Sequence, residues 1–176
     1  MTHQLKSVMI STRTRNFEDM LEDMRQSWIL LKRIPKLQPP YTVYVYNSYP
    51  RSGDWNGSSG RVIGQFICTE SVKLLREDGK INSSIVRPDD FHMVSDYIRN
   101  NLKAGRPLFG MRVTNPVRYA EPLPLTAFES WCDEDCYKCK YWELPSPEEP
   151  GYCKREDFTI TSPPSDWRYV MYKEVL

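Results

Sequence analysis

Alternation of apolar and polar side chains predicts a chain built mainly of short strands. Period-two patterns, or short apolar runs bounded by turn-forming residues, are typical of half-buried or buried strands. The segments that show them are residues 5–11, 28–31, 42–46, 62–71, 108–113 and 167–172. A Gly- and Ser-rich stretch, residues 52–60, predicts a turn between the third and the fourth of these strands.

Two segments instead repeat apolar side chains at the spacing of a helix. The first, residues 16–24, has Asn16 in the N-cap position. The second, residues 88–102, begins with a proline and two aspartates and ends before Gly105. Its expected inward positions are Phe91, Val94, Ile98 and Leu102. Many strands, few helices and no strand–helix–strand alternation favour an α+β, mainly β fold, a small, partly open β-barrel with two or three peripheral helices.

Length and composition indicate one globular domain, residues 1–176. A share of 40% hydrophobic and 27% charged side chains is typical of a folded domain. We find no apolar run long enough to cross a membrane, and the first residues lack the apolar region of a signal peptide. We therefore expect a cytoplasmic protein that does not bind membranes.

The formal net charge of +1 conceals an uneven distribution along the chain. The first 120 residues carry 18 basic and 11 acidic side chains, a net +7. Residues 121–157 carry 4 basic and 10 acidic side chains, a net −6. A basic body is compatible with a nucleic-acid partner even though the total charge is almost zero.

Four of the five cysteines, Cys132, Cys136, Cys139 and Cys153, fall within 22 residues. In a reducing cytosol this cluster points to a metal, and thiolate ligands select zinc or an iron–sulfur cluster. The first three match the spacing used by radical SAM enzymes, but those enzymes place an aromatic residue where this chain has Lys138. We expect a structural Zn²⁺ in a knuckle-like insertion at residues 129–157; metal-free thiols or disulfides and an iron–sulfur cluster are the alternatives. The fifth, Cys68, lies in an apolar run and is expected to be a buried thiol.

A series of short motifs resembles the ASCH domain family, relatives of the PUA fold, and especially the ASCH proteins of phages and prophages. The motifs, in family order, are VMIS (8–11), KRIPK (32–36), VYVY (43–46), VIGQF (62–66), LFG (108–110), YAEPLPLTAF (119–128) and PPSDWRYV (163–170). The resemblance implies a small barrel with a cleft associated with RNA. Some members of the family hydrolyse acylated cytidine nucleosides, and others cut RNA.

Enzymatic members of this family use a lysine and a glutamate that follow the first helix. Counting forward from the first strand aligns them with Arg25 and Trp28, and counting back from KRIP aligns them with Gln26 and Ile29. Neither alignment supplies a carboxylate, and a guanidinium is a poor general base. The resemblance therefore favours a protein that has kept the cleft and lost the hydrolytic groups.

Other family positions also lack groups that titrate near neutral pH. Gln65 stands where a second acid is common, and Met111 and Arg112 stand where a Trp-His pair is common. If the segment is misaligned, carboxylates elsewhere could serve instead. The candidates are Glu22, Asp54 and Glu70, and the two imidazoles of the chain are His3 and His92.

Basic and aromatic side chains near this stretch suit a nucleic acid, because cations bind phosphates and aromatic rings stack on unpaired bases. The expected binding residues are Arg13, Arg15, Arg25, Trp28, Lys32, Arg33 and Arg112. The alternative is that these side chains belong to an ordinary solvated surface and bind no ligand. We therefore hypothesise a non-enzymatic, RNA-binding or other nucleic-acid-binding ASCH-like protein. The alternatives are an active hydrolase of a modified cytidine nucleoside or an RNase, and a phage-type inhibitor whose acidic segment, residues 121–157, mimics nucleic acid toward a host protein.

Overall fold

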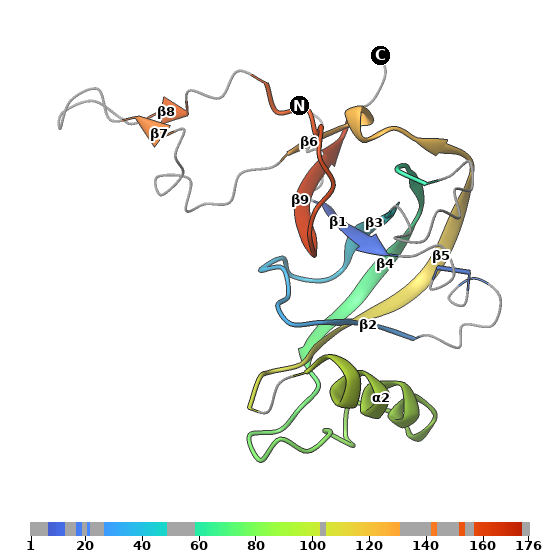
Figure 1. Ribbon diagram of the computed structural model, residues 1–176, viewed down its shortest axis with the longest axis vertical. Coiled ribbons are helices and arrows are strands. Elements are labelled where there is room, and N and C mark those ends of the chain that lie inside the picture. Colours follow the sequence, from blue (N-terminus) through green and yellow to red (C-terminus); the bar gives the residue numbers. More distant parts are fainter. Residues whose placement is uncertain are drawn as a thin grey trace.

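The computed structural model describes residues 7–12, 17–18, 21, 27–48, 59–102, 105–130, 142–143, 152–153 and 157–173. These residues form a seven-stranded sheet and a separate two-stranded sheet (Figure 1). The strands of the large sheet are β1 (Ser7–Thr12), β2 (Trp28–Leu31), β3 (Tyr41–Asn47), β4 (Val62–Lys73), β5 (Phe109–Leu123), β6 (Phe128–Ser130) and β9 (Trp167–Tyr172). The small sheet pairs β7 (Trp142–Glu143) with β8 (Tyr152–Cys153).

The large sheet has the strand order β2-β5-β4-β3-β1-β9-β6. Strands β1 and β3 pair in parallel, and the other neighbours in the order are antiparallel. Within the described ranges the end strands β2 and β6 do not pair with each other, so the sheet stays open. The prediction of a mainly β α+β fold is confirmed, and no closed barrel forms in the part of the chain that the structure describes.

Strand β5 is 15 residues long, whereas the sequence pattern predicts only residues 108–113. The prediction ends early because the continuation, TNPVRYAEPL, contains two prolines, which usually interrupt strands. The structure accommodates the first of them at an irregularity, where Thr114 pairs with Ile67 but Val117 already pairs with Gln65. Asn115 lies between these pairs with a φ of 49°, so a β-bulge absorbs the extra residue and the strand continues.

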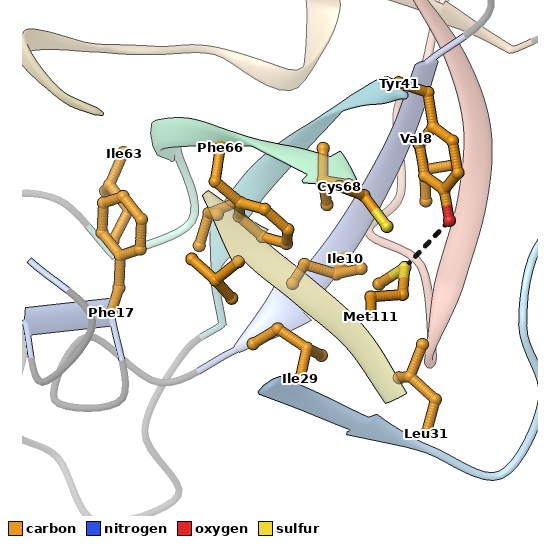
Figure 2. Packing of buried hydrophobic residues seen from close by; sticks show 13 residues of the cluster. Val8, Ile10, Phe17, Ile29, Leu31, Tyr41, Ile63, Phe66, Cys68 and Met111 are labelled. Atoms are coloured by element: carbon orange, nitrogen blue, oxygen red, sulfur yellow. Dashed lines mark hydrogen bonds between the residues drawn. The ribbon is translucent and has the colours of Figure 1, made fainter. Parts of the chain in front are cut away.

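The main hydrophobic cluster fills one face of the curved sheet (Figure 2). On β3, Val43 and Val45 belong to it, whereas Tyr46 belongs to a second cluster, as period-two alternation requires. Tyr41 donates a hydrogen bond of 3.3 Å to the sulfur of Met111 across the first cluster. These strands are therefore held by packing on both faces of the sheet.

Helix α2 (Phe91–Asn101) follows a single 3₁₀ turn, η1 (Pro88–Asp90), and packs on a third cluster that includes Trp28. Its buried residue is Val94, and the other inward positions that the sequence predicts are partly buried against the same cluster. A second 3₁₀ turn, η2 (Leu125–Ala127), precedes β6. The helix thereby covers the end of the sheet where β2 lies (Figure 1). None of the helices in the described ranges has the length and apolar character needed to cross a bilayer.

Candidate nucleic-acid interface

A cleft of about 400 Å³ lies between β1, β2, helix α2 and the loop that leads into β9. Its lining mixes apolar and polar side chains. The apolar and hydroxyl side chains come mainly from the two strands, and the polar ones from the helix and the loop. The lining includes Thr12, Ile29, Leu31, Asp96, Tyr97, Asn100 and Asp166.

Asp166 reaches the cleft because its loop is bonded to β1. The Ser11 amide donates to the Asp166 carbonyl at 3.3 Å, and the Ser11 hydroxyl donates to the Pro164 carbonyl at 2.6 Å. Burial raises the pKa of the Asp166 carboxyl, although Arg33 and Lys32 act in the opposite direction. Burial and the nearby Asp166 also raise the pKa of the Tyr97 hydroxyl, which therefore stays protonated and can donate a hydrogen bond.

The chain that leaves β2 beside this cleft carries three exposed cations, Lys32, Arg33 and Lys36, which we call the basic segment. Two side chains of β9 hold its backbone. The Trp167 indole Nε1 donates to the Arg33 carbonyl at 3.0 Å, and the Lys36 amide donates to the Tyr169 hydroxyl at 2.7 Å. The backbone of the basic segment is thus fixed while its three cationic side chains remain in solvent.

The two aromatic residues beneath the basic segment also contact each other. The ring centroids of Trp167 and Tyr169 lie 5.1 Å apart at 66°, an edge-to-face arrangement that aromatic pairs favour. Both side chains are half-buried. Exposed cations and partly accessible aromatic rings therefore occupy one region of the surface.

Arg112 and Trp28, which the sequence places among the binding residues, are engaged with each other. The Arg112 guanidinium lies 4.3 Å from the centre of the Trp28 ring, and its Nε donates to the Glu70 carboxylate at 2.9 Å. The Trp28 side chain has 0% exposure. In this structure Trp28 has no open ring face on which a base could stack, and Glu70 serves as the partner of a cation.

The two positions at which the motif resemblance predicts a catalytic glutamate are buried and apolar. Trp28 is 0% exposed and Ile29 is 8% exposed. Gln65 lies on the opposite face of the sheet, where its side-chain oxygen accepts a hydrogen bond from Tyr119. His92 lies on α2, exposed, with its Nε2 3.2 Å from an oxygen of Asp96.

Several predicted residues lie outside the described residues. Among the candidate binding, catalytic and metal-ligating residues these are His3, Arg13, Arg15, Glu22, Arg25, Asp54, Cys132, Cys136 and Cys139. The backbone of Cys153 is described, in β8, opposite Trp142. The zinc site and the binding roles of Arg13, Arg15 and Arg25 therefore remain predictions. Cys68 is a buried thiol, as predicted, and burial raises its pKa.

Sequence reasoning missed four polar groups of the cleft: Asp96, Tyr97, Asn100 and Asp166. The first three share one side of α2, but a polar helix face is what any solvated helix presents. Asp166 lies in the motif PPSDWRYV, yet nothing in the motif shows that its loop packs against β1. These groups meet only through long-range contacts.

The fold and this cleft define a small, mainly β protein of the α+β class with a basic, aromatic surface beside a cleft of mixed polar and apolar lining. Among solved structures, the chain is similar to ASCH from Zymomonas mobilis, with 14% sequence identity and a TM-score of 0.48, covering 68% of this chain and 73% of that chain. Two variants of that protein align comparably: one at 14% identity and a TM-score of 0.48, over 69% of this chain and 76% of the other, and one at 14% and 0.46, over 68% and 76%. No protein-family model matches the chain, and no curated protein matches it. These neighbours bear the name of the family that the sequence motifs resemble.

Proposed function

We propose that this protein binds single-stranded RNA along the basic segment and the adjoining cleft. The observation that carries the proposal is the fixed backbone of the basic segment, which presents Lys32, Arg33 and Lys36 to solvent above Trp167 and Tyr169. Cations bind phosphates, and partly exposed aromatic rings offer stacking surfaces to unpaired bases. Both kinds of group lie within the reach of one nucleotide strand.

The two cations beside β2 are available to a polyanion. Among the ion pairs of the described residues, none involves Lys32 or Arg33. Both cations act to lower the pKa of Asp166, which lines the cleft, and this supports the proposal. A phosphate bound here therefore does not have to displace a paired carboxylate.

The charges that line the cleft bear on where the RNA backbone would lie. Asp166 repels phosphates, whereas Asp96 is paired with Arg99, whose Nη1 lies 3.2 Å from its carboxylate. The sugar-phosphate backbone is therefore expected to follow the basic segment rather than to enter the cleft beside Asp166. Asn100, Tyr97 and the two carboxyl groups can instead hydrogen-bond to base edges. The cleft would then read bases while the basic segment supplies most of the affinity.

Fluorescence anisotropy with a short labelled single-stranded RNA tests this proposal. A Lys32→Ala/Arg33→Ala double variant should weaken binding, and two lost phosphate contacts should reduce the slope of log Kd against log salt by about 1.4, at about 0.7 per contact. A Lys80→Ala/Arg87→Ala double variant is the matched control, because both side chains are exposed and neither lines the cleft. Equal affinity and equal slope in the two variants would refute the assignment, and stronger binding to DNA of the same sequence would reassign the ligand.

Hydrolysis is a second candidate function, favoured by the raised pKa of Asp166 beside the protonated Tyr97 hydroxyl. A carboxyl and a phenol hydroxyl side by side in a cleft are the kinds of group that serve as general acids and bases. The substrate class would be an acylated cytidine nucleoside or RNA. Turnover by the wild-type protein that is lost in Asp166→Asn, with RNA affinity retained, supports this function; no turnover by the wild-type protein rejects it.

We also propose that Cys132, Cys136, Cys139 and Cys153 hold a structural Zn²⁺, on the chemistry of four closely spaced thiolates. Metal binding would supply the free energy that orders a segment with few aliphatic side chains. Zinc content measured by mass spectrometry should fall in Cys139→Ser and stay unchanged in Cys68→Ser, the control with a buried, isolated thiol. Retention of zinc and of protease resistance in Cys139→Ser would show that the four-ligand assignment is wrong.

A further inference from the structure

A second pocket, of about 410 Å³, lies on the face of the sheet away from the main hydrophobic cluster. It is built on β3, β4, β5 and β9, and it shares no lining residue with the cleft. On β3, Tyr44 points to the pocket whereas its neighbours Val43 and Val45 point to the main cluster. The pocket is therefore a separate feature of the fold.

Three tyrosines, Tyr44, Tyr119 and Tyr172, line this pocket. The ring centroids of Tyr44 and Tyr172 lie 6.4 Å apart with 33° between the ring planes. A base sandwiched between two rings needs a separation of about 7 Å, twice the contact distance between carbon atoms. These two rings therefore form one aromatic wall, against which a flat ligand can lie on one of its faces.

Phe128 supports this wall from behind. Its ring meets that of Tyr44 at 4.8 Å and 66°, and that of Tyr172 at 5.4 Å and 57°. Phe128 itself is fully buried. The aromatic wall is thus held in place by the second hydrophobic cluster and does not have to order itself when a ligand binds.

Gln65 offers its amide nitrogen to the pocket. The Tyr119 hydroxyl donates to the Gln65 Oε1 at 2.6 Å, which fixes the amide plane. Burial raises the pKa of Tyr119, so this hydroxyl keeps its proton and remains a donor at neutral pH. With the oxygen used by Tyr119, the two N–H groups of Gln65 are left as donors to a ligand.

Two opposite charges complete the lining, Arg118 and Glu121. One Arg118 nitrogen, Nη1, donates to Glu18 at 3.2 Å, and the side chain is 50% exposed, so its other N–H groups can reach an anion in solvent. Glu121 is exposed, and its carboxylate can accept hydrogen bonds. The lining as a whole is close to neutral and offers both donors and an acceptor.

We propose that this pocket binds one nucleobase of a ribonucleotide, with the tyrosine wall against the base, Gln65 and Glu121 on its edge and Arg118 toward its phosphate. A quaternary ammonium ion also suits tyrosine rings, but it would face the Gln65 N–H groups and the Arg118 cation. A neutral, flat heterocycle with acceptors and an amino group uses every polar group of the lining. The site extends the proposed RNA footprint to a second face of the sheet, and free nucleotides can test it without the cleft.

Isothermal titration calorimetry with the four ribonucleoside 5′-monophosphates tests the site. We expect at least one of them to bind the wild-type protein, and Gln65→Leu, which keeps the shape and removes the amide, to weaken that binding about tenfold. Gln38→Leu is the matched control, because it makes the same replacement at an exposed glutamine that does not line the pocket and should leave the Kd within about twofold. Circular dichroism confirms that each variant is folded.

The same titration on Lys32→Ala/Arg33→Ala separates the two sites. Unchanged mononucleotide binding, together with weakened RNA binding, supports a pocket that is independent of the basic segment. The proposal is overturned if no monophosphate binds the folded wild-type protein, or if Gln65→Leu binds as tightly as wild type. Binding of choline without binding of any nucleotide would also overturn it and assign the pocket to a cation.

Discussion

Replacing Ile29 with glutamate places a carboxyl group in the main hydrophobic cluster, and the structure predicts a large, pH-dependent loss of stability. Ile29 is 8% exposed and packs in the main cluster with Ile10 and Met111 (Figure 2). Burial of an isoleucine side chain contributes about 1.5–3 kcal/mol, which the variant loses at every pH. The carboxyl adds a second cost, because it must either ionise in an apolar environment or bind a proton.

The size of the second cost follows from the ordinary pKa of glutamate, about 4.3. Keeping such a group protonated costs about 4 kcal/mol at about pH 7.5 and about 1 kcal/mol at about pH 5. The folded-state pKa is raised, so the stability of the variant falls as pH rises above the unfolded value. We expect the penalty of Ile29→Glu to grow by up to about 3 kcal/mol between these two pH values.

Urea unfolding at both pH values, followed by tryptophan fluorescence, measures the two contributions. Ile29→Gln has almost the same shape and no ionisable group, so the difference between the two variants isolates the cost of the carboxyl. The reasoning is refuted if Ile29→Glu and Ile29→Gln are equally stable at both pH values. That result would mean that the side chain at position 29 reaches water through the cleft and that the position can still carry an acid.

Three further outcomes follow from other contacts. Gly110→Ala should destabilise the fold by about 1–3 kcal/mol, because the new Cβ would lie 2.7 Å from Cε3 of Trp28. Gly105→Ala has open space around its Cβ but a φ of 76°, so it should cost about 1 kcal/mol through backbone strain alone. Asp166→Asn should raise the urea midpoint at neutral pH and leave it unchanged below the ordinary aspartate pKa. The reason is that a raised pKa of Asp166 makes the wild-type protein less stable as this carboxyl ionises. A midpoint that falls at neutral pH would contradict this. Arg112→Ala should lower the free energy of unfolding by about 1–2 kcal/mol, because it removes the contacts with Trp28 and Glu70. Arg112→Lys should recover only part of this loss. An unchanged urea midpoint in Arg112→Ala would show that these contacts do not stabilise the fold.

Local patterns were sufficient for most elements of the fold. The bounds of β2 and β9 coincide with their apolar patterns, and α2 begins just after the proline and aspartates that mark its start. Strand β5 was predicted too short because a proline usually ends a strand, and a bulge placed by pairing with β4 overrides that rule here. Pairing with a distant strand is information that a local pattern does not contain.

The sequence by itself determined the class of fold, the basic character of residues 32–36 and the apolar character of residues 28–31. Only the tertiary structure decided which side chains contact one another or line the same cavity. It buries Trp28 against Arg112, brings Asp166 to Tyr97 and joins Tyr44, Gln65 and Tyr119 in one pocket. The physical reason is that a side chain's accessibility and partners depend on strand register and loop packing, which link residues far apart in the chain.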